Sequence, residues 1–183
     1  MFSDSNLKRW TSSISAAAIA VVGVLGSISS PASAQPATCT RRVEGTTPLT
    51  GIPANVLAFA RRNTPTGVTL TRTADIERTA TTTIYELRGY RSNGCSVEVD
   101  VIARGAALTL DEVEEQLPSV TQLPQVVRNT LASRARGFRA TLIERSSRPA
   151  GVVVYELEGT LNGQGREIDI NSNGTLISIQ AAS

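Results

Sequence analysis

The chain has 183 residues, with 18 Lys and Arg against 16 Asp and Glu, and no histidine. This near-balance of charge argues against nucleic acid or an anionic membrane as the main partner. With no histidine, and with Lys8 as the only lysine, a Ser–His or Cys–His nucleophile pair is excluded and a zinc site would lack imidazole ligands. We therefore expect no cofactor and no metal site, and only carboxylates, tyrosines, hydroxyls and arginines remain for catalysis.

The first 34 residues have the order of a secretory signal peptide. Lys8 and Arg9 precede an apolar run over 14–28, and the small residues 32–34, of sequence Ala-Ser-Ala, stand ahead of Gln35. This pattern predicts cleavage after Ala34 and a secreted or periplasmic protein. The alternative is an uncleaved membrane anchor, but the run is shorter than the ~20 residues that a spanning helix needs. We expect no stable membrane insertion after cleavage.

Residues 35–50 are rich in Pro and Thr and are interpreted as an N-terminal tail or linker. Cys39 in this tail and Cys95 are the only two cysteines. An even count in an exported chain predicts a disulfide, which would tie the tail to the first repeat. Two free thiols are the alternative.

Residues 51–117 predict one helix and four strands. Pro53 suits the first turn of a helix, and Val56, Leu57 and Ala60 follow at helical spacing. The runs after this helix alternate apolar and polar residues, as strands with one buried face do. These runs cover residues 68–73, 81–90, 95–103 and 106–110.

The acidic stretch that follows is interpreted as the start of a short helix. Asp111 could cap it, with Glu114 three positions later completing a capping box. An acidic first turn suits the helix dipole. A helix with a solvated face is favoured here over a cluster of catalytic carboxylates.

Residues 118–183 repeat the pattern of the first unit. A helix is predicted after Pro124, and strands are predicted over 138–146, 152–161, 166–171 and 175–179. The residues of the second strand match in order: Tyr85 with Tyr155, Glu86 with Glu156, Leu87 with Leu157, and Gly89 with Gly159. We infer an internal duplication. The predicted fold class is α+β, with two repeats that each pack one helix on a four-stranded antiparallel sheet.

Alternation places one face of each predicted sheet away from its helix. Because a single helix covers only one face, the other face must meet water or a partner. We expect a binding surface there, formed by Glu86, Arg88, Glu98, Asp100, Glu156, Glu158, Glu167 and Asp169.

Two glycine-containing stretches are interpreted as hairpin turns. Residues 162–165, of sequence NGQG, lack the Lys and Ser/Thr of a phosphate loop. Residues 169–174, of sequence DINSNG, resemble the start of a calcium loop, but the twelfth position is Gln180 and not Glu. Since Asn-Gly between alternating runs is a strong hairpin signal, the turn is favoured over weak calcium binding.

These motifs give the chain a family resemblance. A proline before each helix, a Tyr-Glu-Leu-x-Gly strand, and a charged alternating strand that ends in a glycine hairpin recur at 52–53, 85–89, 98–105, 123–124, 155–159 and 167–174. In these features the chain resembles tandem PepSY-like proteins over nearly all of residues 52–179. Two such units resemble the fold of secreted β-lactamase inhibitor proteins, whose concave sheet face grips a partner enzyme.

The resemblance implies a non-enzymatic, inhibitor-like module that binds a protein or peptide through its open sheet face. The first alternative is a structural or chaperone-like component of the cell envelope. The second is an enzyme that uses carboxylates, for which the outward Glu and Asp residues would be the candidates.

Overall fold

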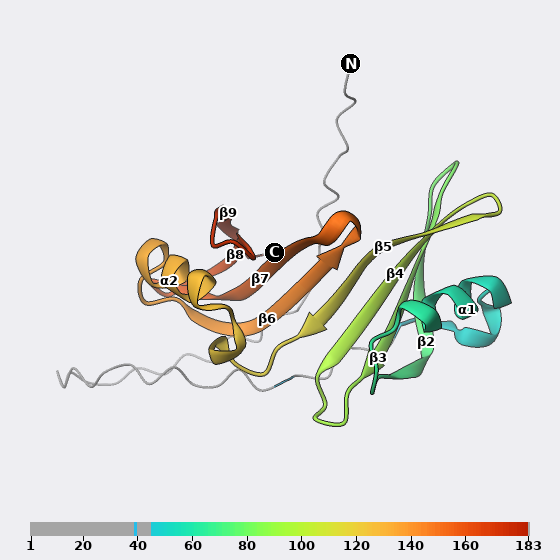
Figure 1. Cartoon of the computed structure of the whole chain (residues 1–183), viewed down its shortest axis with the longest axis horizontal. Coiled ribbons are helices and arrows are strands. Elements are labelled where there is room, and N and C mark those ends of the chain that lie inside the picture. The colour runs from blue at the N-terminus through green and yellow to red at the C-terminus, as the bar shows by residue number, and fades with distance from the viewer. Residues whose placement is uncertain (1–38, 40–44, 183) are drawn as a thin grey trace, which may run out of the picture. The chain divides into compact units, whose positions relative to one another are not determined.

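Figure 1 shows a computed structural model of the chain, which describes Cys39 and residues 45–182. The predicted signal peptide, its cleavage after Ala34 and most of the tail lie outside the described residues. No helix in the described part is long and apolar enough to cross a membrane.

The described elements follow one another as two similar series. The first has β1 (Thr47–Pro48), α1 (Ala54–Asn63), β2 (Thr69–Arg78), β3 (Thr83–Tyr90), β4 (Ser96–Arg104) and β5 (Ala107–Gln116). The second has α2 (Gln125–Arg134), β6 (Arg139–Arg148), β7 (Val152–Leu161), β8 (Gln164–Asn171) and β9 (Leu176–Ala181). Short 3₁₀ turns stand at Leu49–Gly51, Val120–Gln122 and Pro149–Gly151.

The strands of 45–182 form one antiparallel sheet of nine, in the order β1 to β9. The prediction of two repeats, each with a helix on its own four-stranded sheet, is therefore wrong. Val113–Gln116 of β5 pairs with Glu144–Ser147 of β6 and joins the two series. The physical reason is that a separate four-stranded sheet would leave the outer N–H and C=O groups of β5 unpaired.

The helix predicted to begin at Asp111 is also wrong. Residues 107–116 continue as β5, and Val113 lies buried between β4 and β6. Its Cα partners are Val99 and Ser147. Pairing on both sides outweighs the helix propensity of the glutamates, which is a weak local preference.

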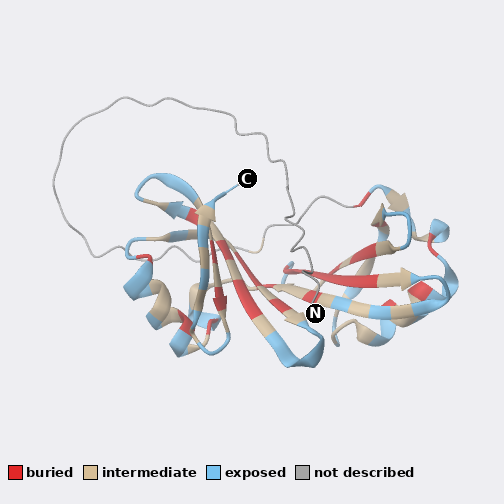
Figure 2. Ribbon diagram, turned by 90° about the horizontal axis from the view of Figure 1, so that it is seen from above, coloured by how far each residue is buried: buried red, intermediate tan, exposed pale blue. Residues whose placement is uncertain are grey.

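Both helices pack on the same face of the sheet, here called the helix face. Val56 and Ala60 of α1 join a core cluster with Leu87 and Val99, and the equivalent cluster of α2 surrounds Val127. The strand register shows that the two clusters lie on one side of the sheet. One line of directly paired positions crosses β3 to β7 through Leu87, Val99, Val113, Ser147 and Val153. Tyr155 and Leu157 follow Val153 at every second position of β7 and therefore lie on the same side. Figure 2 shows the buried residues along the strands and the exposed ones at the turns.

The two glycine-containing stretches form hairpins, as predicted. Asn162 and Gly163 both have positive φ, at 53° and 77°, and connect β7 to β8. The second turn connects β8 to β9, where Gly174 has φ 86° and the Asn171 N–H bonds to the Thr175 carbonyl at 2.9 Å. Positive φ at both central residues is the type I′ geometry that matches strand twist.

Candidate functional site: an acidic sheet face

The eight charged residues singled out from the sequence all lie on the face opposite the helices. Glu86 is the Cα partner of Asp100, and Arg88 that of Glu98. In the second series Glu156 pairs with Asp169, and Glu158 with Glu167. Because the sheet is continuous, residues predicted on two separate sheets share one surface.

Five further carboxylates lie on this face and were missed from the sequence: Asp75 and Glu77 of β2, Glu112 and Glu114 of β5, and Glu144 of β6. The alternation in Ala74-Asp75-Ile76-Glu77 was the signal that could have revealed the first two. We call this surface the acidic face, and its carboxylates are Asp75, Glu77, Glu86, Glu98, Asp100, Glu112, Glu114, Glu144, Glu156, Glu158, Glu167 and Asp169.

The acidic residues are arranged in rows, with like charges directly opposite each other on neighbouring strands. The first acidic row crosses four strands, from β2 to β5, through Asp75, Glu86, Asp100 and Glu112. The second acidic row crosses β6 to β8 through Glu144, Glu156 and Asp169. Like charges directly opposite one another destabilise a sheet, so this face works against the stability of the fold.

The centre of the first row is buried. Glu86 is 1% exposed and Asp100 3%, and Glu98, beside the row on β4, is 7% exposed. The sequence led us to expect solvated charges at these positions, and the structure shows otherwise. Burial removes the water that would screen one carboxylate from the next, so their mutual repulsion is stronger than on a solvated strand.

Arg88 and Arg148 offset part of this charge. The guanidinium of Arg88 lies 2.9 Å from Asp75 and 3.8 Å from Glu86, and its Nε donates to Glu98. Arg148 pairs with Glu112 at 2.8 Å, and Ser146 Oγ donates to the same Glu112 oxygen at 2.6 Å. Arg148 also lies 3.6 Å from Glu156, the middle residue of the second row.

Three buried carboxylate oxygens have no hydrogen-bond partner among the described residues: Glu86 Oε1, Asp100 Oδ1 and Asp169 Oδ1. The second oxygen of Asp169 accepts from Ser178 Oγ at 2.7 Å. An unpartnered buried oxygen is costly when its carboxylate is ionised. The fold therefore favours the protonated form of Glu86 and Asp100, whose pKa values are raised mainly by burial.

The pKa values follow this arrangement. Burial, aided by the nearby charge of Glu98, raises the pKa of Glu86 to about 8, although Arg88 opposes the shift. Burial and Glu112 raise the pKa of Glu156 to about 7. Burial, with Glu98 and Glu114, raises the pKa of Asp100 well above its ordinary value. The rows thus hold carboxyl groups that change charge near neutral pH.

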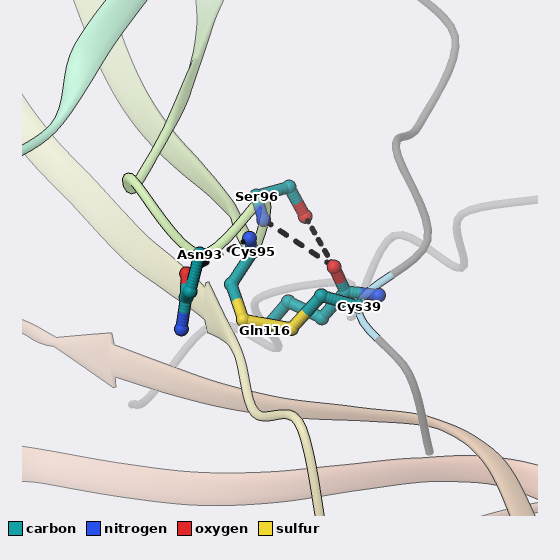
Figure 3. The surroundings of a disulfide bond; sticks show 5 residues. All are labelled: Cys39, Asn93, Cys95, Ser96 and Gln116. Atoms are coloured by element: carbon teal, nitrogen blue, oxygen red, sulfur yellow. Dashed lines mark hydrogen bonds between the residues drawn. A yellow bond between two sulfur atoms is a disulfide. The ribbon is translucent and has the colours of Figure 1, made fainter.

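The predicted disulfide is present. Cys39 is bonded to Cys95, with 4.7 Å between their Cα atoms. Figure 3 shows this bond beside Asn93, Ser96 and Gln116; Asn93 Oδ1 accepts from the Cys95 N–H at 3.1 Å, and Gln116 Oε1 accepts from the Ser96 N–H at 3.3 Å. The bond ties the N-terminal tail to the start of β4.

Two surface hollows lie away from the acidic rows. One lies beside the C-terminal end of α1, around Arg61 and Pro65, and the other lies along β2, around Arg72 and Tyr90. No carboxylate of the acidic face lines either of them. Among residues 45–182 and Cys39, no group of three or more His, Cys, Asp or Glu residues is placed to hold a metal ion.

Comparison with known proteins identifies the architecture. No protein-family model matches the chain, and no curated protein matches it by sequence. A solved BLIP-like protein from Bacteroides fragilis NCTC 9343 superposes with a TM-score of 0.53 and 16% identity, covering 72% of this chain and 89% of that one. The fold is BLIP-like.

Two further solved structures share this fold. A DUF2874 family protein from Bacteroides uniformis ATCC 8492 has a TM-score of 0.55 and 16% identity, covering 70% of this chain and 88% of that one. A protein provisionally described as periplasmic, from Bacteroides eggerthii DSM 20697, has a TM-score of 0.54 and 13% identity, with coverage of 70% and 88%. At these identities the likeness concerns the fold.

Proposed function

We propose that the chain is an exported, non-enzymatic module that binds a protein or peptide through its acidic face. The observation that carries this proposal is the set of like-charge rows on the face opposite the helices. Local arrangements that destabilise a fold are concentrated at functional sites. The like-charge rows are such an arrangement, which supports a binding role for this face.

Several observations support export and a binding role. The signal-like sequence of residues 1–34, the disulfide and a solved neighbour described as periplasmic all agree with an exported protein. The two hollows lack the carboxylates that a carboxylate enzyme would need, whereas the acidic face is a broad surface of the kind that suits a macromolecule. Tyr85 and Tyr155, at matching positions of the two series, are 8% and 7% exposed, which supports the inferred duplication.

The test is capture of a partner with the disulfide-bonded protein as bait. The wild type and two variants would be immobilised and exposed to the envelope fraction of the source cell, and bound proteins would be identified by mass spectrometry. Glu156→Arg with Glu158→Arg changes the acidic face on β7. Arg61→Glu with Arg62→Glu is the matched control, because both arginines are exposed on α1.

We expect the same protein to be recovered by the wild type and by the α1 control, and lost with the β7 variant. Both variants should remain folded, since charges on partly exposed strands contribute less than about 1 kcal/mol each. Equal capture by all three would refute binding through this face and favour a structural role in the envelope.

A further inference from the structure

The first acidic row holds carboxylate oxygens that its neighbouring arginines do not reach. In the first acidic row, Arg88 contacts Asp75 and Glu86, and Arg148 contacts Glu112. Between these flanks stands Asp100, which is 3% exposed and whose Oδ1 has no partner in the described part of the chain. Oε1 of the neighbouring Glu86 also lacks a hydrogen-bond partner in that part of the chain.

Glu86 Oε1 and Asp100 Oδ1 indicate that the row lacks hydrogen-bond donors. Both belong to carboxylates that are more than nine-tenths buried, and both side chains stand on the acidic face at directly opposed positions of β3 and β4. A buried carboxylate is stabilised most by a hydrogen-bond donor that carries positive charge. A metal ion does not fit, since the described carboxylates form no group that could ligate one.

We propose that the first acidic row binds a basic segment of a partner protein, whose arginine or lysine side chains lie across β2 to β5. This inference rests on the proposed function and names its partner class. It is supported by charge complementarity: four carboxylates in a row need several cations at the spacing of the strands, and a single cation would serve only one pair.

The dimensions of the row suit an extended peptide. Neighbouring strands lie about 4.8 Å apart, so four carboxylates on four strands span on the order of 14 Å. A six-residue extended segment reaches about 20 Å and can cross all of them. Asp75 and Glu112, whose side chains are 30% and 12% exposed, accept direct contacts at the two ends. Glu86 and Asp100 act between them, where low exposure strengthens their attraction for a cation.

Binding of a cation should also release protons. Glu86, whose pKa is raised to about 8 mainly by burial, holds its proton at pH 7 in the free protein and ionises when a positive charge arrives beside it. Non-specific attraction that brings no cation beside Glu86 would not have this effect. A loss of proton release when the first row is altered therefore separates occupation of this row from attraction elsewhere on the face.

The test uses hexa-arginine as the probe and hexa-glutamate as its control, with the disulfide-bonded protein in isothermal titration calorimetry at pH 7. Two buffers of different ionisation enthalpy measure the protons released. Glu86→Gln with Asp100→Asn neutralises the centre of the row. Glu115→Gln is the control, because it removes a carboxyl group that lies on the helix face, outside the row.

We expect the wild type to bind hexa-arginine with release of protons and to ignore hexa-glutamate. The row variant should lose about tenfold or more in affinity, as is usual for close charge pairs at interfaces, and the control should bind as the wild type does. If the row variant does not fold, Glu86→Gln alone replaces it, and this variant should release fewer protons than the wild type on binding hexa-arginine. Equal weakening of both variants, or binding without proton release, would overturn the proposal.

The test also distinguishes a partner protein from two other occupants of the row, the chain's own segment and a second copy. If Arg41→Ala with Arg42→Ala strengthens hexa-arginine binding about tenfold, the chain's own segment 40–44, which lies outside the described residues, is the occupant and the partner proposal is overturned. A wild-type dimer in sedimentation that the row variant dissociates would make a second copy the occupant, with the same consequence. If hexa-arginine fails to bind while envelope capture still depends on Glu156 and Glu158, the proposed function stands and only the basic partner is wrong.

Discussion

Single residues in the acidic rows should make stability depend on pH. The pKa of Glu86 is raised from 4.5 in its ordinary state to about 8 in the fold, mainly by burial. A raised carboxyl pKa means that the folded protein holds the proton more tightly than the unfolded chain does. The stability it contributes is therefore complete below about pH 4.5 and is lost as the pH rises through about 8.

We predict that Glu86→Gln raises the melting temperature by at least about 4 °C at pH 9 and leaves it unchanged at pH 4, because each unit of pKa shift corresponds to about 1.4 kcal/mol. Scanning calorimetry across this range measures the effect. Glu115→Gln is the control: it removes the partner of Arg91 on the helix face, at 2.7 Å, and should gain nothing at pH 9. An equal gain in both variants would contradict the burial argument.

Tyr155 is a core residue of the second series. It is 7% exposed and packs in the cluster of Leu157, Ile168 and Ile170 beneath α2. We predict that Tyr155→Ala lowers the free energy of unfolding by about 3 kcal/mol, as other large-to-small core changes do. Val152→Ala on the same strand, where the side chain is 46% exposed, should cost less than about 0.5 kcal/mol. Denaturant unfolding measures both, and similar losses would show that the burial is misassigned.

At the scale of the elements, the repeated glycine of the Tyr-Glu-Leu-x-Gly motif has a packing reason. A Cβ on Gly159 would lie 2.1 Å from the Arg139 carbonyl oxygen, and one on Gly89 would lie 2.7 Å from that of Thr69. In both places the register of the neighbouring strand shifts, between Ala140 and Leu142 and within β2. The bulged backbone approaches so closely that only glycine leaves room.

Gly159→Ala should therefore destabilise the protein by about 2 kcal/mol or more, because the overlap is with backbone that cannot move aside alone. Gly165→Ala on β8 is the matched control, since its Cβ would meet only the Ala182 side chain at 3.4 Å. Thermal unfolding distinguishes the two. If Gly159→Ala and Gly165→Ala have the same melting temperature, the backbone at the bulge lies farther from Gly159 than the structure indicates.

The elements also show how far the sequence could lead. Alternation located the strand at 152–161 with both ends correct, and the prolines located both helices. The strand β2 runs to Arg78, beyond the predicted end at 73, because a bulge interrupts the alternation that marked it. The prediction of a helix from Asp111 was wrong for another reason. Its glutamates favour a helix locally, and only pairing with β4 and β6 makes it a strand.

At the scale of the whole molecule, only part of the candidate site could be predicted from the sequence. Period two placed the charges of each series on one face, so the chosen residues do lie together. The sequence could not show that β5 pairs with β6, because that pairing is made by backbone groups that every residue carries. Without it, the rows of like charge across β2 to β5 and β6 to β8 could not be recognised as parts of a single surface.

The pairing of β5 with β6 makes a prediction about cooperativity. Backbone pairing over Val113–Gln116 is reinforced by Arg148 with Glu112, at 2.8 Å, and by the Leu117 N–H with the Ile143 carbonyl, at 2.8 Å. Opening this seam would expose the edges of two strands and unpaired carboxylates. We therefore expect residues 45–182 to unfold in one calorimetric transition whose van't Hoff and calorimetric enthalpies agree. Val113→Ala, at the seam, should lower the midpoint and keep a single transition. Two resolved transitions in the wild type would mean that the two series fold independently and that the sheet is joined only weakly at β5 and β6.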